Sequence, residues 1–143
     1  MIQLIHGDCR TALYGIEEGI VNCCVTSPPY WAQRSYLDHP EQLGLEDSPE
    51  EYVERMVEVF KAVKRVLHKS GTLWLNLGDS YAGGGNNRGN TKTLSVKQES
   101  NRGAHGMENH VKNTMNRWSH PEIKRKDLVG ITWMVAFALR KDG

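Results

Sequence analysis

Residues 21–31 read VNCCVTSPPYW, and this stretch decides the fold. Its first six residues include three β-branched side chains and precede a Pro-Pro pair, which predicts a buried strand from Val21 to Thr26. Upstream, the apolar run Ile2–Ile5 predicts another strand, and Thr11–Glu18 carries apolar residues at helical spacing. Strand, helix and strand in this order predict a βαβ unit with a parallel sheet.

A second unit of the same kind follows. A helix is predicted over residues 48–68, because Ser48 is a good N-cap and Glu51 completes a capping box. Gly71 is predicted to stop this helix, and Thr72–Leu77 to form the next strand. One apolar stripe along the helix consists of Tyr52, Met56, Val59, Phe60, Val63, Val66 and Leu67.

Length and composition exclude several classes of protein. A chain of 143 residues with 38% hydrophobic residues suits one soluble α/β domain, and no apolar run approaches the ~20 residues that cross a bilayer. The first residues do not resemble a secretory signal, so a cytoplasmic location is the default expectation. The three cysteines have no C-x-x-C spacing, and neither a disulfide framework nor a metal site is expected.

Charge is distributed unevenly along the chain. Residues 1–85 hold 7 Lys/Arg and 12 Asp/Glu, whereas residues 86–126 hold 9 and 3. Residues 82–120 are expected to form a polar, basic loop, which suits a polyanion such as nucleic acid, although a solvated loop that is merely basic explains the charge equally well. A last helix is expected within residues 121–143, with Asp127 as its N-cap.

Ser27 to Tyr30 carry the clearest chemical signal, at the carboxyl end of a predicted parallel strand, where α/β sheets bind ligands. The Pro-Pro pair makes the chain rigid and rich in hydrogen-bond acceptors. Ser27 and the Pro28 carbonyl could hold an exocyclic amino group while Tyr30 stacks on the base that bears it. The alternative is a strand-ending turn with ordinary core aromatics.

Ser27-Pro28-Pro29-Tyr30 matches the D/N/S-P-P-Y/F/W motif of the amino-directed DNA methyltransferases, which methylate cytosine N4 or adenine N6 with S-adenosylmethionine. The chain resembles this family in three further segments, which occur in the right order: His6–Cys9, Leu43–Tyr52 and Gly71–Ser80. Their order resembles the circularly permuted group. The resemblance implies a partial Rossmann-like methyltransferase fold, with parallel strands, flanking helices and a long polar loop.

The resemblance also implies roles for individual residues. Ser27, Pro28, Pro29 and Tyr30 would form the catalytic motif, and Asp8 would accept from the adenine amino group of S-adenosylmethionine. Asp8 could equally be a helix N-cap. Further base or cofactor contacts are possible at Trp31, which could also be core, and at Asn76 and Asp79, which could also cap a loop. Methyl transfer from a sulfonium needs no metal, so none is expected.

Parts of the family pattern are absent from this sequence. It contains no F-x-G-x-G cofactor motif, no Trp-x-Lys-Pro strand and no target-recognition domain, so residues 1–143 resemble the N-terminal part of a catalytic domain. Within it, residues 1–81 would be the α/β core segment. Without the strands that carry the missing motifs, Ile2–Ile5 would lack native partners. It would then move beside the second strand, or the chain would be poorly stable alone.

The function expected from the resemblance is site-specific DNA methylation in a restriction-modification setting, with cytosine N4 favoured over adenine N6 because Ser27 occupies the first motif position. The chain could be truncated, a gene remnant or one half of a split enzyme with a complementing C-terminal half. Alone it is expected to be inactive. A non-catalytic nucleic-acid-binding domain and an RNA amino-methyltransferase are the alternatives.

Overall fold

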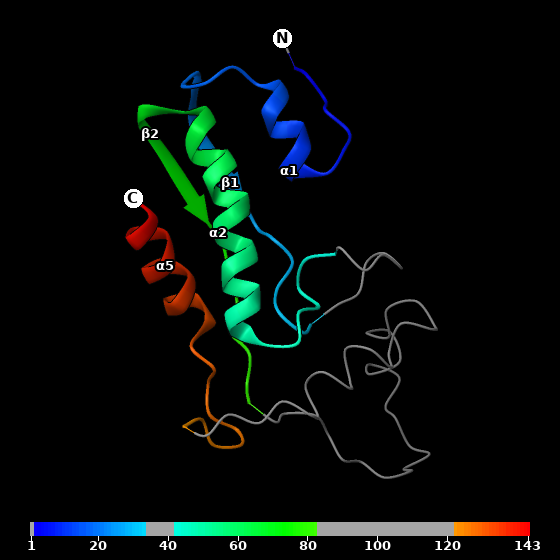
Figure 1. Ribbon diagram of the computed structural model, residues 1–143, viewed down its shortest axis with the longest axis vertical. Coiled ribbons are helices and arrows are strands. Elements are labelled where there is room, and N and C mark those ends of the chain that lie inside the picture. Colours follow the sequence, from blue (N-terminus) through cyan, green and yellow to red (C-terminus); the bar gives the residue numbers. More distant parts are fainter. Residues whose placement is uncertain (1, 34–41, 83–121) are drawn as a thin grey trace. The chain divides into compact units, whose positions relative to one another are not determined.

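The computed structural model describes residues 2–33, 42–82 and 122–143 (Figure 1). The chain divides into two compact units. The first, here the sheet unit, consists of Met1–Pro28, Val53–Leu77 and Thr132–Gly143. The second, here the loop unit, consists of Pro29–Tyr52 and Gly78–Ile131.

The sheet unit is built on two parallel strands, β1 (Val21–Thr26) and β2 (Leu67–Leu75). Helix α2 (Pro49–Val66) connects them, so the second predicted strand, helix and strand unit is confirmed. Figure 1 shows β2 beginning where α2 ends. The protein is thus α/β with a parallel sheet, which is compatible with part of a larger methyltransferase fold.

The predicted end of α2 at His68, with Gly71 as its stop, is wrong. The helix ends at Val66, and Gly71 lies within β2. A Cβ at Gly71 would lie 2.8 Å from the His68 carbonyl oxygen and 3.0 Å from that of Val21. Gly71 is therefore required by a close approach of backbone in an irregular part of the strand pairing, and not by a helix terminus.

The start and apolar stripe of α2 agree with the prediction. The Glu51 amide donates to Ser48 Oγ at 3.2 Å, and Glu51 Oε2 accepts from the amide of Asp47, one residue before the cap. In a standard capping box the Glu51 side chain would accept from the amide of Ser48, and here it accepts from the amide of Asp47 instead. Six members of the predicted stripe are buried: Tyr52, Met56, Val59, Phe60, Val63 and Val66.

The predicted strand at Ile2–Ile5 is wrong. The segment has no regular structure, and Ile2 and Leu4 are 92% and 94% exposed. The helix expected at Thr11–Glu18 is replaced by a shorter helix α1 (Cys9–Ala12) and the 3-10 helix η1 (Leu13–Gly15). A strand forms only where a neighbour satisfies its backbone groups, and among the described residues β1 pairs with β2 alone.

Helix α5 (Ile131–Asp142) confirms a last helix but begins four residues after the predicted cap. Asp127 does not cap it, because Asp127 Oδ2 accepts from the Lys124 amide at 3.2 Å. All but the first residue of the predicted polar loop, 82–120, lies outside the described residues.

Two observations limit the kinds of site that the described residues can form. None of the helices in residues 2–33, 42–82 and 122–143 is long and apolar enough to span a membrane. The same residues contain no group of three or more His, Cys, Asp or Glu side chains placed to hold a metal ion.

Candidate base-binding site

Ser27 and Asn76 follow the carboxyl ends of the two strands of the sheet unit. The Asn76 amide donates to the Thr26 carbonyl at 3.0 Å, which continues the pairing of β1 with β2 past both strands. Ser27 and Asn76 are both exposed. The strand ends therefore present one hydroxyl and one amide side chain to solvent, in the position where parallel sheets bind ligands.

In the loop unit, the second half of the motif is held from several sides. The Tyr52 hydroxyl donates to the Pro29 carbonyl at 2.9 Å, and the Ala32 amide donates to the Gly44 carbonyl at 2.7 Å. Gly44 has φ +91°, and a Cβ there would lie 2.9 Å from the Tyr30 carbonyl oxygen. Only glycine fits at this position, because both its conformation and its contact exclude a side chain.

The Tyr30 ring lies against the backbone of Gly78. A Cβ at Gly78 would lie 2.8 Å from Cε2 and 2.9 Å from Cδ2 of Tyr30, closer than real Cβ atoms approach a ring. Tyr30 is only partly buried. The ring is thus supported on one side by the chain and remains partly accessible, as a stacking platform for a planar ligand requires.

Trp31 occupies the core, which was the alternative to a base contact. Its side chain is 1% exposed, and its Nε1 donates to the Glu46 carbonyl at 2.9 Å. Ser80 Oγ donates to the Trp31 carbonyl at 3.1 Å, while Glu46 Oε2 accepts from the Gly44 amide. Trp31 is therefore an anchor of the loop that carries Tyr30.

Asp79 accepts from the backbone at the start of helix α5, whereas the alternative role considered from the sequence was a loop cap. Its Oδ1 accepts from the amides of Ser80 at 2.8 Å and Ile131 at 3.1 Å, and both carboxylate oxygens accept from Gly130 at 3.1 Å. These bonds satisfy amides at the start of α5 that have no partner within the helix. The carboxylate therefore has a structural role, and a base or cofactor contact at Asp79 stays a prediction.

Asp8 is the N-cap of α1 in the sheet unit. Its Oδ1 accepts from the Arg10 amide at 2.8 Å, and the Arg10 guanidinium contacts both carboxylate oxygens, at 3.1 and 2.8 Å. The Asp8 side chain remains 46% exposed. Asp8 thus has the helix-capping role that was the alternative to a cofactor contact, and the cofactor contact stays a prediction.

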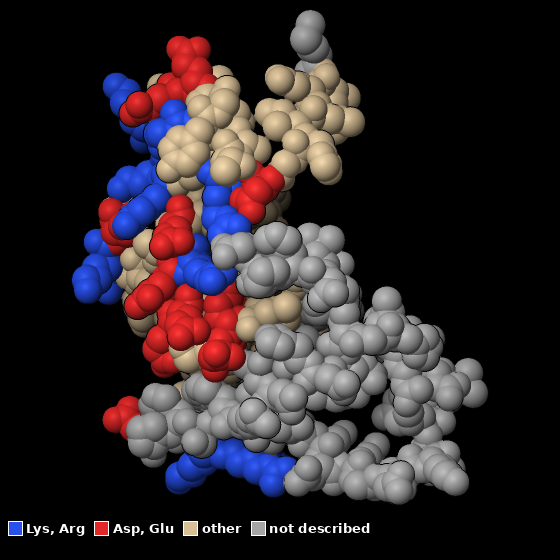
Figure 2. All heavy atoms as spheres, turned by 45° about the vertical axis from the view of Figure 1, so that its right-hand side comes forward, with Lys and Arg blue, Asp and Glu red and all other residues tan. Residues whose placement is uncertain are grey.

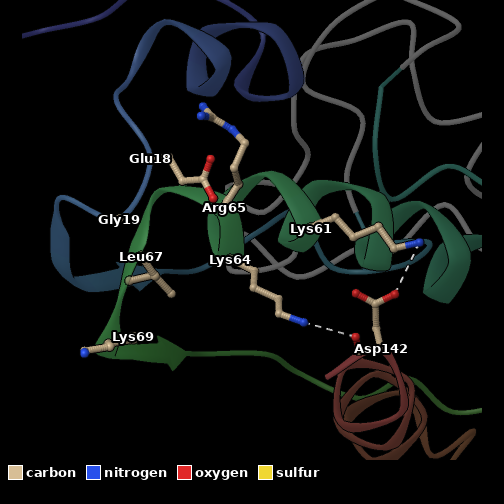
Figure 3. Close-up of a pocket in the computed structure, with 8 residues that line it drawn as sticks. All are labelled: Glu18, Gly19, Lys61, Lys64, Arg65, Leu67, Lys69 and Asp142. Carbon is tan, nitrogen blue, oxygen red and sulfur yellow. Dashed lines mark hydrogen bonds and ion pairs between the residues drawn. The ribbon is translucent and has the colours of Figure 1, made fainter.

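A pocket of about 550 Å³ lies at the other end of the strands in the sheet unit (Figure 3). Lys61 Nζ pairs with Asp142 Oδ1 at 3.2 Å, and Lys64 Nζ donates to the Asp142 carbonyl at 3.1 Å. Leu67, where β2 begins, lines the pocket. The pocket therefore opens at the amino end of β2 and does not include Ser27 or Asn76.

Figure 2 shows both acidic and basic side chains on the visible face of the described residues, and neither sign covers that face alone. Helix α2 has Glu50 and Glu51 in its first turn and Lys64 and Arg65 in its last, an order that complements the helix dipole. The basic stretch within residues 86–126 falls mostly outside the described residues.

The residues that hold the loop were not predicted as functional. Tyr52 was assigned to the apolar stripe of α2 and to a segment of the family resemblance, and Gly44, Glu46 and Gly78 only to such segments. One signal was available in the sequence: a tyrosine on a buried stripe needs a partner for its hydroxyl. The identity of that partner, the Pro29 carbonyl, depends on tertiary structure.

Comparison with known proteins identifies a family and several relatives that this chain resembles. A family described as DNA methylase matches residues 21–134. The chain is 41% identical over 142 residues to the type II methyltransferase M.SmaI of Serratia marcescens, an alignment that covers 99% of this chain and 44% of that protein. With M.Cfr9I of Citrobacter freundii the identity is 42% over 142 residues, covering 98% and 42%.

A third relative matches a shorter region. M.SfiI of Streptomyces fimbriatus is 53% identical over 78 residues, which cover 54% of this chain and 18% of that methyltransferase. No solved structure matches the chain significantly. The chain spans less than half the length of these curated relatives. Since the family match includes β1, the Ser27–Tyr30 motif, α2 and β2, the chain belongs to the DNA methylase family.

Proposed function

We propose that this chain supplies the target-base part of an S-adenosylmethionine-dependent DNA methyltransferase with a Rossmann-like fold. The observation that carries the proposal is the Ser27-Pro28-Pro29-Tyr30 motif, which follows the carboxyl end of a parallel strand in a member of the DNA methylase family. The proposed substrate is an exocyclic amino group of a base that has left the DNA stack.

The roles of the motif follow from its chemistry. Ser27 Oγ and the Pro28 carbonyl accept hydrogen bonds from the amino group and orient its nitrogen, while Tyr30 stacks on the base. The amino nitrogen would gain the methyl group as the methyl–sulfur bond of the cofactor breaks and leaves a neutral thioether, and the nitrogen would release one proton, for which the exposed Ser27 offers a path to water. Pro29 keeps the turn rigid between the two halves of the motif.

The described residues fit the cofactor in part. The Asp8 side chain is 46% exposed, and a carboxylate is a hydrogen-bond acceptor of the kind that suits the adenine amino group of S-adenosylmethionine. When bound, this cofactor supplies an electrophilic methyl group on a sulfonium. Asn76, exposed beside Ser27 at the strand ends, is the other side chain that could contact base or cofactor.

We propose further that a complementing segment completes the enzyme, either in the same polypeptide or in another. Parallel sheets are covered on both faces, yet Val25 and Trp74, which are paired across β1 and β2, are 78% and 66% exposed. Cys23 and Thr72, paired two positions earlier, are exposed as well. We call these four residues the open sheet face, and the part of the relatives that this chain does not match is its proposed occupant.

The test combines this chain with the unmatched part of the Serratia relative and supplies labelled S-adenosylmethionine and DNA. We expect labelled DNA with both polypeptides and none with this chain alone. Ser27→Ala and Tyr30→Ala should each abolish labelling, whereas Tyr81→Phe, at a side chain that is 59% exposed, should not change it. Full labelling with both alanine variants would refute the catalytic assignment.

The methylated nucleoside in the product shows which base was the target. Because a serine hydroxyl is a weaker acceptor than the carboxylate of other family members, we propose cytosine N4 in preference to adenine N6. Mass spectrometry of the nucleosides separates the two, and RNA in place of DNA tests the remaining amino-methyltransferase alternative. The reaction is proposed to take place in the cytoplasm, as part of restriction and modification.

A second candidate is non-catalytic nucleic-acid binding by the chain alone. It is favoured by the absence of an F-x-G-x-G cofactor motif from residues 1–143. DNA binding that is unaffected by Tyr30→Ala, together with no labelling in the presence of the Serratia segment, would support this candidate over the first.

A further inference from the structure

This inference rests on the proposed role of Tyr30 and concerns what holds that ring in place. In the loop unit, the peptide that joins Pro29 to Tyr30 has its carbonyl oxygen bonded to the Tyr52 hydroxyl at 2.9 Å. The Tyr52 side chain is completely buried. One hydrogen bond inside the core therefore fixes the orientation of the peptide from which Tyr30 begins.

The Tyr30 side chain has its own support at Gly78. A side chain there would clash with ring atoms Cε2 and Cδ2, at 2.8 and 2.9 Å, so the ring occupies the space that a Cβ would take. Gly78 lies three residues beyond the end of β2. The ring is thereby held on one side by rigid backbone rather than by another mobile side chain.

We infer that Tyr52 and Gly78 are positioning residues for the target base: Tyr52 fixes the Pro29 carbonyl, and Gly78 fixes the plane of the Tyr30 ring. Neither residue touches the base. A stacking surface that is set before the base arrives costs less ordering on binding, and misplacement of a positioned group by about 1 Å can cost about 100-fold in rate.

The hydroxyl of Tyr52 is what distinguishes it from its neighbours on the stripe. Met56 and Phe60, both buried on the same helix, fill the core without a polar group. Phenylalanine at position 52 would fill nearly the same volume. Burial raises the pKa of Tyr52, with smaller contributions from Glu46 and Tyr30, so the hydroxyl stays protonated and can donate at neutral pH.

The test measures binding of the 143-residue chain to two DNA duplexes of the same sequence. In one duplex a cytosine faces an abasic position and is free to leave the stack, and in the other every base is paired. The readout is the ratio of the two affinities, measured by fluorescence anisotropy. Because both affinities come from the same folded sample, a general loss of stability lowers both and leaves their ratio unchanged.

We expect the wild-type chain to prefer the duplex with the free cytosine, and Tyr30→Ala to abolish that preference. Tyr52→Phe should lower the preference by about 2- to 10-fold, the range expected for one net hydrogen bond. Gly78→Ala should lower it by a similar factor, because the ring must move. Tyr81→Phe, which changes an exposed tyrosine in the same unit, should leave the ratio unchanged.

The outcomes separate this inference from the proposed function. If Tyr30→Ala abolishes the preference but Tyr52→Phe and Gly78→Ala retain it in full, the positioning roles are wrong and the role of Tyr30 stands. If the wild type has no preference, or Tyr30→Ala keeps it, the stacking role fails and the positioning roles fail with it. If Tyr52→Phe does not fold, Gly78→Ala alone decides.

Discussion

The two units of this protein differ in the burial of particular large side chains. In the loop unit, Trp31 and Tyr52 are buried and each donates its polar hydrogen to a backbone carbonyl. In the sheet unit, Leu4, Val25 and Trp74 are exposed. The difference teaches that the turn proposed to receive the target base is held by contacts among the described residues, whereas one face of the sheet is exposed, and it is on this face that we propose a further segment packs.

The largest expected effect compares two tryptophans, one in each unit. Trp31→Ala should lower the free energy of unfolding by about 3–5 kcal/mol, because it leaves a cavity in the core. Trp74→Ala should change it by less than about 1 kcal/mol, because Trp74 is 66% exposed. Urea unfolding followed by circular dichroism measures both. Equal losses would show that the two regions do not differ as described.

A smaller effect is expected at the two capping aspartates. Asp79→Ala should cost about 1–2 kcal/mol, since its carboxylate accepts from the amides of Gly130 and Ile131 at the start of a helix of 12 residues. Asp8→Ala should cost about 0.5 kcal/mol or less, since α1 has 4 residues and Asp8 is exposed. The same urea experiment compares them, and a larger loss for Asp8→Ala would contradict the comparison.

A pH effect is expected at Tyr52. Its pKa is raised in the folded protein, chiefly by burial, so above pH ~10 the unfolded chain loses this proton while the folded chain keeps it. The unfolded state then binds fewer protons, and stability falls as pH rises, by at most about 1.4 kcal/mol per pH unit for this group.

Unfolding measured between pH 9 and 11 tests this effect. Tyr52→Phe should remove that part of the alkaline slope, whereas Tyr81→Phe, at an exposed side chain, should retain it. An alkaline slope that is the same in Tyr52→Phe and in the wild type would show that burial does not keep the Tyr52 hydroxyl protonated.

The smallest effect is expected at the pocket of the sheet unit. Lys61→Ala removes the 3.2 Å pair with Asp142, in which the lysine side chain is 59% exposed. Exposed pairs contribute about 0–1 kcal/mol, so the loss should stay under about 0.5 kcal/mol and shrink further in 1 M salt. A loss above about 2 kcal/mol would mean that this exposed pair stabilises the protein as strongly as a buried contact does.

The sequence predicted those elements whose partners lie within this chain. Val21–Thr26, the start of α2 and its buried stripe follow from periodicity and capping residues, and they match the structure. Ile2–Ile5 carries an equally good strand pattern but forms none. The apolar pattern of Ile2–Ile5 shows which side chains the segment could bury, but a strand also needs a neighbour to pair with, and the described residues contain no strand beside it.

At the candidate site, the motif could be located from the sequence but its supports could not. Ser27 to Tyr30 stand out as a rigid turn after a strand. The assignments of Trp31 to the core and of Asp79 to a helix cap depend on contacts 15 and 51 residues away along the chain, which local patterns do not contain. The same holds for Gly78, whose need for glycine comes from the Tyr30 ring.

The central claim has two parts. The contacts that hold the turn carrying Tyr30 lie within this chain. The open sheet face is proposed to be covered by the segment that the relatives contain and this chain does not match. Cys23, exposed on the open sheet face, reports on it directly. We predict that a thiol reagent labels Cys23 rapidly in the chain alone and much more slowly once the unmatched part of the Serratia relative is added, with the labelled residue identified by peptide mass spectrometry. An unchanged labelling rate at Cys23 would contradict the account.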